Sequence, residues 1–268
     1  MLKDITLGQF FPGNTIVHRL DPRTKILAGD LYIVALFSAD SVLTYVLAAA
    51  VLALCILVSK VPFKSLTKGL KPILIIVIFT AVMNLFFTKG TAICDVWLLR
   101  HITWEGLAAA AKMMVRIVML IMGTFLLTYT TSPISLTDGL ESLLGFLKKI
   151  KVPVHELSMM MSIALRFIPT LIEETDKIMS AQKARGADFE SGNIFQRAKA
   201  LVPILVPLFI SAFRRADELA TAMECRCYHG GEGRTALHVL HYKTADWLTL
   251  AGFVALAAGV IVLGKFGL

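Results

Sequence analysis

The chain has 268 residues, of which 56% are hydrophobic and only 17% are charged. A soluble domain usually has about a quarter of its residues charged, so this composition excludes an ordinary soluble protein and predicts a polytopic membrane protein. The net charge is +8, but the basic residues cluster between apolar runs, as in the cytoplasmic loops of membrane proteins. No RNA-binding pattern of aromatic and basic residues accompanies them, which argues against nucleic acid as a partner.

The first half of the chain predicts a polar cytoplasmic leader over residues 1–25 and transmembrane helices over residues 26–131. A span needs about 20 helical residues, and several apolar segments of this order follow one another. We place two spans joined by a tight turn near Asp40, a third from Pro72 to Phe87 and a fourth from Gly106 to Tyr129. The lysine-rich segment from Lys60 to Lys71 is then a cytoplasmic loop, and the segment from Thr88 to Thr103 is an external one.

Charged residues lie inside the predicted spans. Asp30 is in the first span, and Lys112 and Arg116 lie one helical turn apart in the fourth. Such residues usually face protein or water and often matter for function. Alternatively, the charges are structural: Lys112 snorkels to the interface, and Arg116 pairs with Asp30. The sequence leaves both interpretations open.

Residues 132–243 predict a cytoplasmic helical domain, and residues 244–268 predict a last span. We expect an amphipathic helix over residues 134–150, which can lie along the membrane surface. Two long helices follow, from Pro153 to Lys183 and from Ile194 to Met223. The apolar middle of the second has about 13 residues, too few for a span, so we expect it to pack on the first long helix. The complete prediction is an all-α polytopic membrane protein with about five spans, its N-terminus inside and its C-terminus outside.

The ends of the two long helices are similar in sequence. A shift of 226 − 185 = 41 positions places Asp176 on Asp217 and Arg185 on Arg226. Each arginine lies between small residues, namely Ala184 and Gly186 in the first segment and Cys225 and Cys227 in the second. A guanidinium offers five donors suited to carboxylates on a partner. A cation at a helix C-terminus is also favourable by itself, but two similar tips indicate two similar partner subunits.

The sequence shows no catalytic, nucleotide-binding or metal-binding constellation. It lacks the phosphate-binding loop, the Gly-x-Ser-x-Gly elbow and the dinucleotide-binding glycine motif. His155-Glu156 begins like a zinc-protease motif, but Met159 stands where the second histidine belongs. Cys225 and Cys227 with His229 fall short of the four ligands of a structural zinc site. We therefore predict no catalytic residue and no metal site.

Several motifs along the chain match a known family. They are Leu20-Asp21-Pro22-Arg23-Thr24-Lys25, Thr131-Ser132-Pro133, Val152-Pro153-Val154-His155-Glu156-Leu157 and Ala181-Gln182-Lys183-Ala184-Arg185-Gly186-Ala187-Asp188-Phe189. In these, the chain resembles the transmembrane T component of energy-coupling factor transporters, which import vitamins and metal ions in prokaryotes. The last motif is similar to the Ala-Arg-Gly signature of the family's first coupling helix. The second signature departs from that pattern, because Arg226 is flanked by cysteines.

The resemblance implies a multi-pass subunit of the prokaryotic cell (inner) membrane that works with other proteins. Two ATP-binding-cassette ATPases, which bind the ATP and Mg²⁺, each receive one of the tips at Arg185 and Arg226. A separate membrane protein, the S component, binds the substrate and packs on apolar surfaces of the T component. Methionine-rich surfaces adapt to different partners, so Met159, Met160 and Met161 are candidate S-component contacts. This chain itself then binds no cofactor and catalyses no reaction.

The alternative is a self-contained secondary transporter or channel. It needs polar residues along a path and often has two repeated membrane halves. The spans hold few such residues, and the repeat lies in the cytoplasmic segment instead. An intramembrane enzyme needs paired His, Asp or Glu residues at membrane depth, and the spans contain no such pair.

Overall fold

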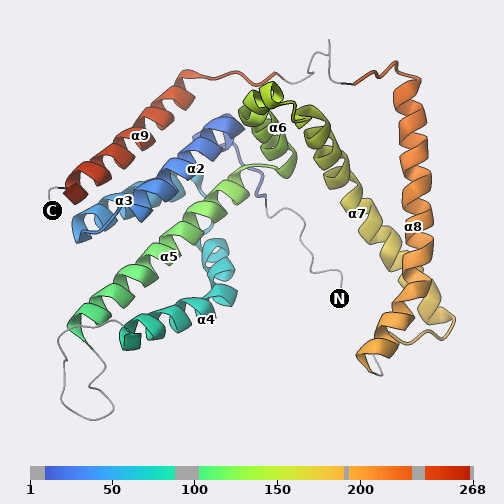
Figure 1. Ribbon diagram of the computed structural model, residues 1–268, viewed down its shortest axis with the longest axis horizontal. Coiled ribbons are helices and arrows are strands. Elements are labelled where there is room, and N and C mark those ends of the chain that lie inside the picture. The colour runs from blue at the N-terminus through green and yellow to red at the C-terminus, as the bar shows by residue number, and fades with distance from the viewer. Residues whose placement is uncertain (1–9, 88–102, 190–192, 231–238, 266–268) are drawn as a thin grey trace. The chain divides into compact units, whose positions relative to one another are not determined.

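The computed structural model describes residues 10–87, 103–189, 193–230 and 239–265, and its regular structure in these ranges is helical (Figure 1). The helices are α1 (Ile16–Arg19), α2 (Pro22–Phe37), α3 (Val42–Ser59), α4 (Phe63–Phe87), α5 (Trp104–Thr130), α6 (Pro133–Leu143), α7 (Val154–Ala184), α8 (Ile194–Glu224) and α9 (Thr244–Lys265). The all-α architecture predicted from the sequence is confirmed.

The described chain forms two compact units. The first, here called the membrane unit, runs up to Gly139 and resumes at Leu240. The second, here called the coupling unit, runs from Leu140 to Val239. Helix α6 therefore begins in one unit and ends in the other, while α7 and α8 belong wholly to the coupling unit.

Small side chains hold the helices of the membrane unit close together. Ala35 and Ala48 are completely buried in a core formed by α2, α3, α5 and α9. Gly123 on α5 faces the ring of Tyr32 on α2, and a Cβ atom at Gly123 would lie 3.0 Å from that ring. Membrane helices associate through such close backbone approaches, because lipid gives no hydrophobic force between them.

Five of the described helices are long and apolar enough to cross a membrane, but they are not the five that the sequence predicts. The set contains α3, α4 from Gly69, α5, α8 from Phe195 and α9. Helix α2 has only 16 residues, because it begins at a cap formed by Asp21 and ends at a turn before Asp40. Helix α8 has 31 residues and enters this set by length and composition alone, so its expected position outside the membrane stays a prediction.

Two predicted element boundaries also differ. The segment from Lys60 to Lys71 is not a loop, because α4 begins at Phe63. Lysine is a good helix former, and the buried Leu66 anchors these first turns. The predicted helix over residues 134–150 is α-helical only to Leu143 and continues as 3₁₀ turns over Leu144–Ile150. Most of the predicted external loop over residues 88–103 lies outside the described residues.

Candidate functional site

The carboxyl end of α7 is closed by a specific set of backbone hydrogen bonds. The amide of Gly186 donates to the carbonyl of Lys183 at 3.0 Å, and the amide of Ala187 donates to that of Gln182 at 3.0 Å. Gly186 has a left-handed backbone, with φ of 86°. This is the Schellman arrangement, which satisfies the last carbonyls of a helix and reverses the chain. The last residue before the reversal is Arg185.

The carboxyl end of α8 is closed in the same way. The amide of Cys227 donates to the carbonyl of Glu224 at 2.8 Å, and the amide of Tyr228 donates to that of Met223 at 3.1 Å. Cys227 is left-handed, with φ of 55°. Every donor and acceptor lies 41 positions after its counterpart on α7. The register found in the sequence is therefore also the register of the hydrogen bonds, and Arg226 corresponds to Arg185.

Both arginines are available to a partner molecule. Arg185 and Arg226 are exposed, and so are their neighbours Ala184, Gly186, Cys225 and Cys227. Within the described part of the chain, neither guanidinium has a hydrogen-bond or ion-pair partner. A Cβ atom added at Gly186 would meet nothing within 4 Å, so the backbone there is open to close approach. In Figure 1, α7 and α8 run in opposite directions, so their carboxyl ends lie at different ends of the pair.

A second site, which the sequence analysis left unexplained, lies in the membrane unit. The carboxylate of Asp246 is 1% exposed and accepts hydrogen bonds from the backbone amides of Asp21 at 2.8 Å and Lys243 at 2.7 Å. Asp21 in turn accepts two hydrogen bonds from the guanidinium of Arg23, whose Cζ lies 4.1 Å from the centre of the Tyr242 ring. This buried cluster ties the start of α2 to the start of α9.

Burial and hydrogen bonding act in opposite directions on the charge of Asp21. Burial alone raises the pKa of this carboxyl, but the hydrogen bonds from Arg23 outweigh burial and hold the pKa below its usual range. Asp21 therefore stays ionised, and it caps α2 by accepting a hydrogen bond from the amide of Arg23 at 2.9 Å. The Leu20-Asp21-Pro22-Arg23-Thr24-Lys25 motif is thus a helix start fixed by an internal ion pair.

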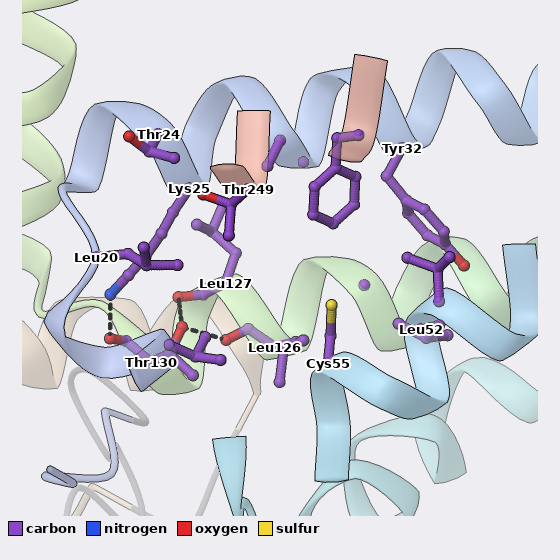
Figure 2. Close-up of a pocket in the computed structure, with 16 residues that line it drawn as sticks. Leu20, Thr24, Lys25, Tyr32, Leu52, Cys55, Leu126, Leu127, Thr130 and Thr249 are labelled. Carbon is purple, nitrogen blue, oxygen red and sulfur yellow. Dashed lines mark hydrogen bonds between the residues drawn. The ribbon is translucent and has the colours of Figure 1, made fainter. Parts of the chain in front are cut away.

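Lys25 extends the cluster to α5. Its amine donates to the carbonyl of Thr130 at 2.9 Å (Figure 2) and to the carbonyl of His18 at 3.1 Å. The side chain borders an apolar cavity of about 110 Å³, which is lined among others by Leu126 and Phe253. The ends of α2, α5 and α9 therefore meet at one cluster.

Two of the predicted charges inside the spans bind backbone carbonyls, as in the structural one of the two interpretations, but with other partners than expected. Arg116 donates to the carbonyl of Ala39 at 2.7 Å, and Lys112 donates to that of Asp40 at 2.7 Å. The expected pairing of Arg116 with Asp30 was wrong, because Asp30 is exposed and Arg116 lies 3.9 Å from the Asp40 carboxylate instead. Both cations bind the carbonyls that follow α2, where helices leave such acceptors unsatisfied.

The remaining predicted positions lie on α7 or outside the described residues. Met160 and Met161 are exposed on the first half of α7, and Met159 is half-buried. His155, at the start of α7, contacts Glu141 at 2.8 Å between Nδ1 and Oε1, which fixes the corner between α6 and α7. In the ranges that the structure describes, no group of three or more His, Cys, Asp or Glu residues is arranged to hold a metal ion.

These features define an all-α polytopic membrane protein with a duplicated arginine-bearing helix end. Residues 13–237 match the family model CbiQ, described as a cobalt transport protein. The chain is 52% identical over 263 residues to the energy-coupling factor transporter transmembrane protein EcfT of Ruminiclostridium cellulolyticum, with 98% of each chain covered. It is 58% identical over 249 residues to EcfT of Clostridium kluyveri, with 92% of each covered. It is 49% identical over 259 residues to EcfT of Bacillus subtilis, with 96% of this chain and 97% of the relative covered.

The chain therefore belongs to the CbiQ/EcfT family, the transmembrane proteins of energy-coupling factor transporters. The family resemblance found from the sequence motifs is confirmed, and the match covers both units. The chain is accordingly a membrane subunit of a transporter.

The left-handed residue that follows each arginine yields a prediction about the two tips. We expect Gly186→Val to open the end of α7, because a left-handed backbone costs a non-glycine residue about 1–2 kcal/mol and a β-branched one more. Cys227→Gly should have the opposite effect at the end of α8. Hydrogen exchange measured by mass spectrometry is expected to speed up in the peptide over residues 182–187 of the first variant and to slow down over residues 223–228 of the second. Unchanged exchange in both would contradict the assignment of these helix ends.

Proposed function

We propose that this chain is the T component that couples two ATP-binding-cassette ATPases to substrate uptake through a separate S component. The single observation that carries the proposal is the pair of helix ends, closed by the same hydrogen bonds 41 residues apart and each presenting an exposed arginine. Two equivalent tips suit two equivalent or closely similar partner subunits. The chain itself binds no cofactor in this proposal, and ATP with Mg²⁺ is bound and hydrolysed by the ATPases.

The chemistry of the tips supports an acidic partner surface. The planar fork of a guanidinium binds carboxylates through two parallel hydrogen bonds. Small neighbours at Ala184 and Gly186 leave room for a partner surface beside Arg185, and Cys225 and Cys227 do so beside Arg226. We expect one ATPase at each tip, with its carboxylates on the arginine.

The membrane unit supports the proposed orientation, with the N-terminus and the coupling unit in the cytoplasm. The hydrogen bond from Lys25 to Thr130 places the start of α2 beside the end of α5, and the bond from Asp21 to Asp246 places it beside the start of α9. These helix ends then share one face of the membrane, as alternating spans require. Basic residues around them favour the cytoplasmic face.

Exposed apolar side chains on the coupling unit support a membrane-embedded partner. Met160 is 55% exposed, and its flexible thioether adapts to surfaces of different shape. Helix α8 also carries an exposed apolar row formed by Leu201, Val202, Leu205, Val206, Phe209 and Ile210. We propose that Met159, Met160 and Met161 contact the S component and that the row on α8 faces the S component and the bilayer. The substrate, a vitamin or a transition-metal ion, binds to the S component.

Reversing both tip charges tests the contact with the ATPases. The tagged chain is expressed with candidate ATPases from the same organism, as the wild type and as Arg185→Glu/Arg226→Glu. We expect the wild type to bring down the ATPases and the double variant to lose them, because like charges then face each other. Arg197→Glu, the same change at another exposed position of the coupling unit, should retain them. If the wild type purifies alone and transports a solute in liposomes, the chain is a self-contained carrier and the proposal fails.

A single substitution tests the contact with the S component. We expect Met160→Glu to weaken co-purification of the S component while the ATPases remain bound, because it places a charge in an apolar contact. Met160→Leu, which keeps the side chain apolar and of similar size, should behave as the wild type. Retention of the S component by Met160→Glu would show that this part of α7 does not form the contact.

A further inference from the structure

Helices α7 and α8 are joined by one polar cluster. The carboxylate of Glu174 on α7 accepts a hydrogen bond from the hydroxyl of Ser211 through one oxygen, and its other oxygen lies 2.7 Å from Nη2 of Arg215. A further hydrogen bond runs from the side-chain amide of Gln182 to the backbone carbonyl of Pro203 at 3.5 Å. Gln182 follows Glu174 on α7, whereas its partner Pro203 precedes Arg215 on α8, so the two helices run antiparallel.

The position of this ion pair follows the repeat. Glu174 precedes Arg185 by 185 − 174 = 11 residues, and Arg215 precedes Arg226 by 226 − 215 = 11 residues. The two partners are therefore 215 − 174 = 41 positions apart, the same offset as the two tips. At about 1.5 Å per helical residue, each tip lies about 16 Å along its helix from the pair. The ion pair thus joins equivalent points of the two segments.

The parts of α7 and α8 that precede the ion pair are also nearly equal in length. Glu174 lies 174 − 154 = 20 residues after the start of α7, and Arg215 lies 215 − 194 = 21 residues after the start of α8. These two segments, here called the long arms, each measure about 30 Å. The prolines within the helices, Pro169, Pro203 and Pro207, all lie in the long arms. The short arms between the pair and the tips are unbroken helix.

The surroundings of the pair distinguish it from its neighbours. The side chains of Glu174 and Arg215 are 22% and 32% exposed, so water screens their attraction only in part. The hydroxyl of Ser211 holds the carboxylate in place from the same helix as Arg215. Glu173 and Arg214, which are also 41 positions apart, are both exposed and form no hydrogen bond or ion pair with another described residue.

We propose that Glu174 and Arg215 are positioning residues that hold α7 and α8 together at one fixed point, here called the pin, which is equally far from the two tips. When a tip is displaced, its helix then rotates about the pin and does not slide along the other helix. With arms of about 16 and 30 Å, a displacement at a tip is nearly doubled at the far end of its helix. The far part of α7 carries the exposed Met160 and Met161. The consequence for transport rests on the proposed function, but the pin itself is a property of this chain.

The pin is tested first on the full chain by itself. Spin labels are attached at Ala184→Cys and the native Cys225, in a background in which Cys55 and Cys94 are replaced by Ser and Cys227 by Gly. We expect one narrow distribution of distances between the labels. Glu174→Gln should broaden it, and Glu173→Gln should leave it unchanged. The exchange Glu174→Arg/Arg215→Glu should restore it, because the pair is rebuilt with reversed charges. A narrow distribution in Glu174→Gln would overturn the proposal.

The second test measures coupling in the reconstituted complex with its ATPases and S component. We expect Glu174→Gln to retain both partners and to hydrolyse ATP, but to lower the substrate taken up per ATP severalfold, with recovery in the charge exchange. Unchanged uptake per ATP would overturn the pin as a coupling element. If even the wild type binds no ATPase, the proposed function fails, whereas the label distances still decide whether the pin exists.

Discussion

The buried carboxylate of Asp246 is the constraint on which the arrangement of the membrane unit depends. It accepts hydrogen bonds from the backbone amides of Asp21 and Lys243, and so it fixes the starts of α2 and α9 to each other. A carboxylate that is almost completely buried is stable only when it is hydrogen-bonded or paired, and removing one partner of such a group is strongly destabilising. Within the same unit, Gly139 packs on Pro22 and the Tyr242 ring stacks on the guanidinium of Arg23.

The coupling unit follows a different principle, in which one local structure is used twice. The hydrogen bonds that end α7 and α8 are the same at an offset of 41, and the ion pair of Glu174 with Arg215 has that offset too. Local rules of helix termination thus produce two similar tips, and one residue of the ion pair lies 11 positions before each of them. The proposed function uses both tips, with one ATPase at each.

The sequence predicted features that depend on neighbouring residues and missed those that depend on distant ones. The 41-residue register was visible because the two segments match residue by residue, with Asp176 on Asp217 and Arg185 on Arg226. The partner of Asp21 was not visible, because Asp246 is 225 positions away and no periodic pattern links the two residues. Arg116 was paired with Asp30 because both lie in predicted spans, but the sequence does not give the rotation of each helix about its axis. The helix that carries Asp30 begins at Pro22 and not at residue 26, because the side chain of Asp21 caps it.

We propose that each tip binds one ATPase, and native mass spectrometry of the purified complex can count the bound subunits. We expect a wild-type complex with two ATPases per chain. Arg185→Glu alone and Arg226→Glu alone should each leave complexes that have lost ATPase from one tip, with a single ATPase as the main species. Two ATPases retained in both single variants, or a wild-type chain that carries none, would show that the tips do not bind the ATPases in this way.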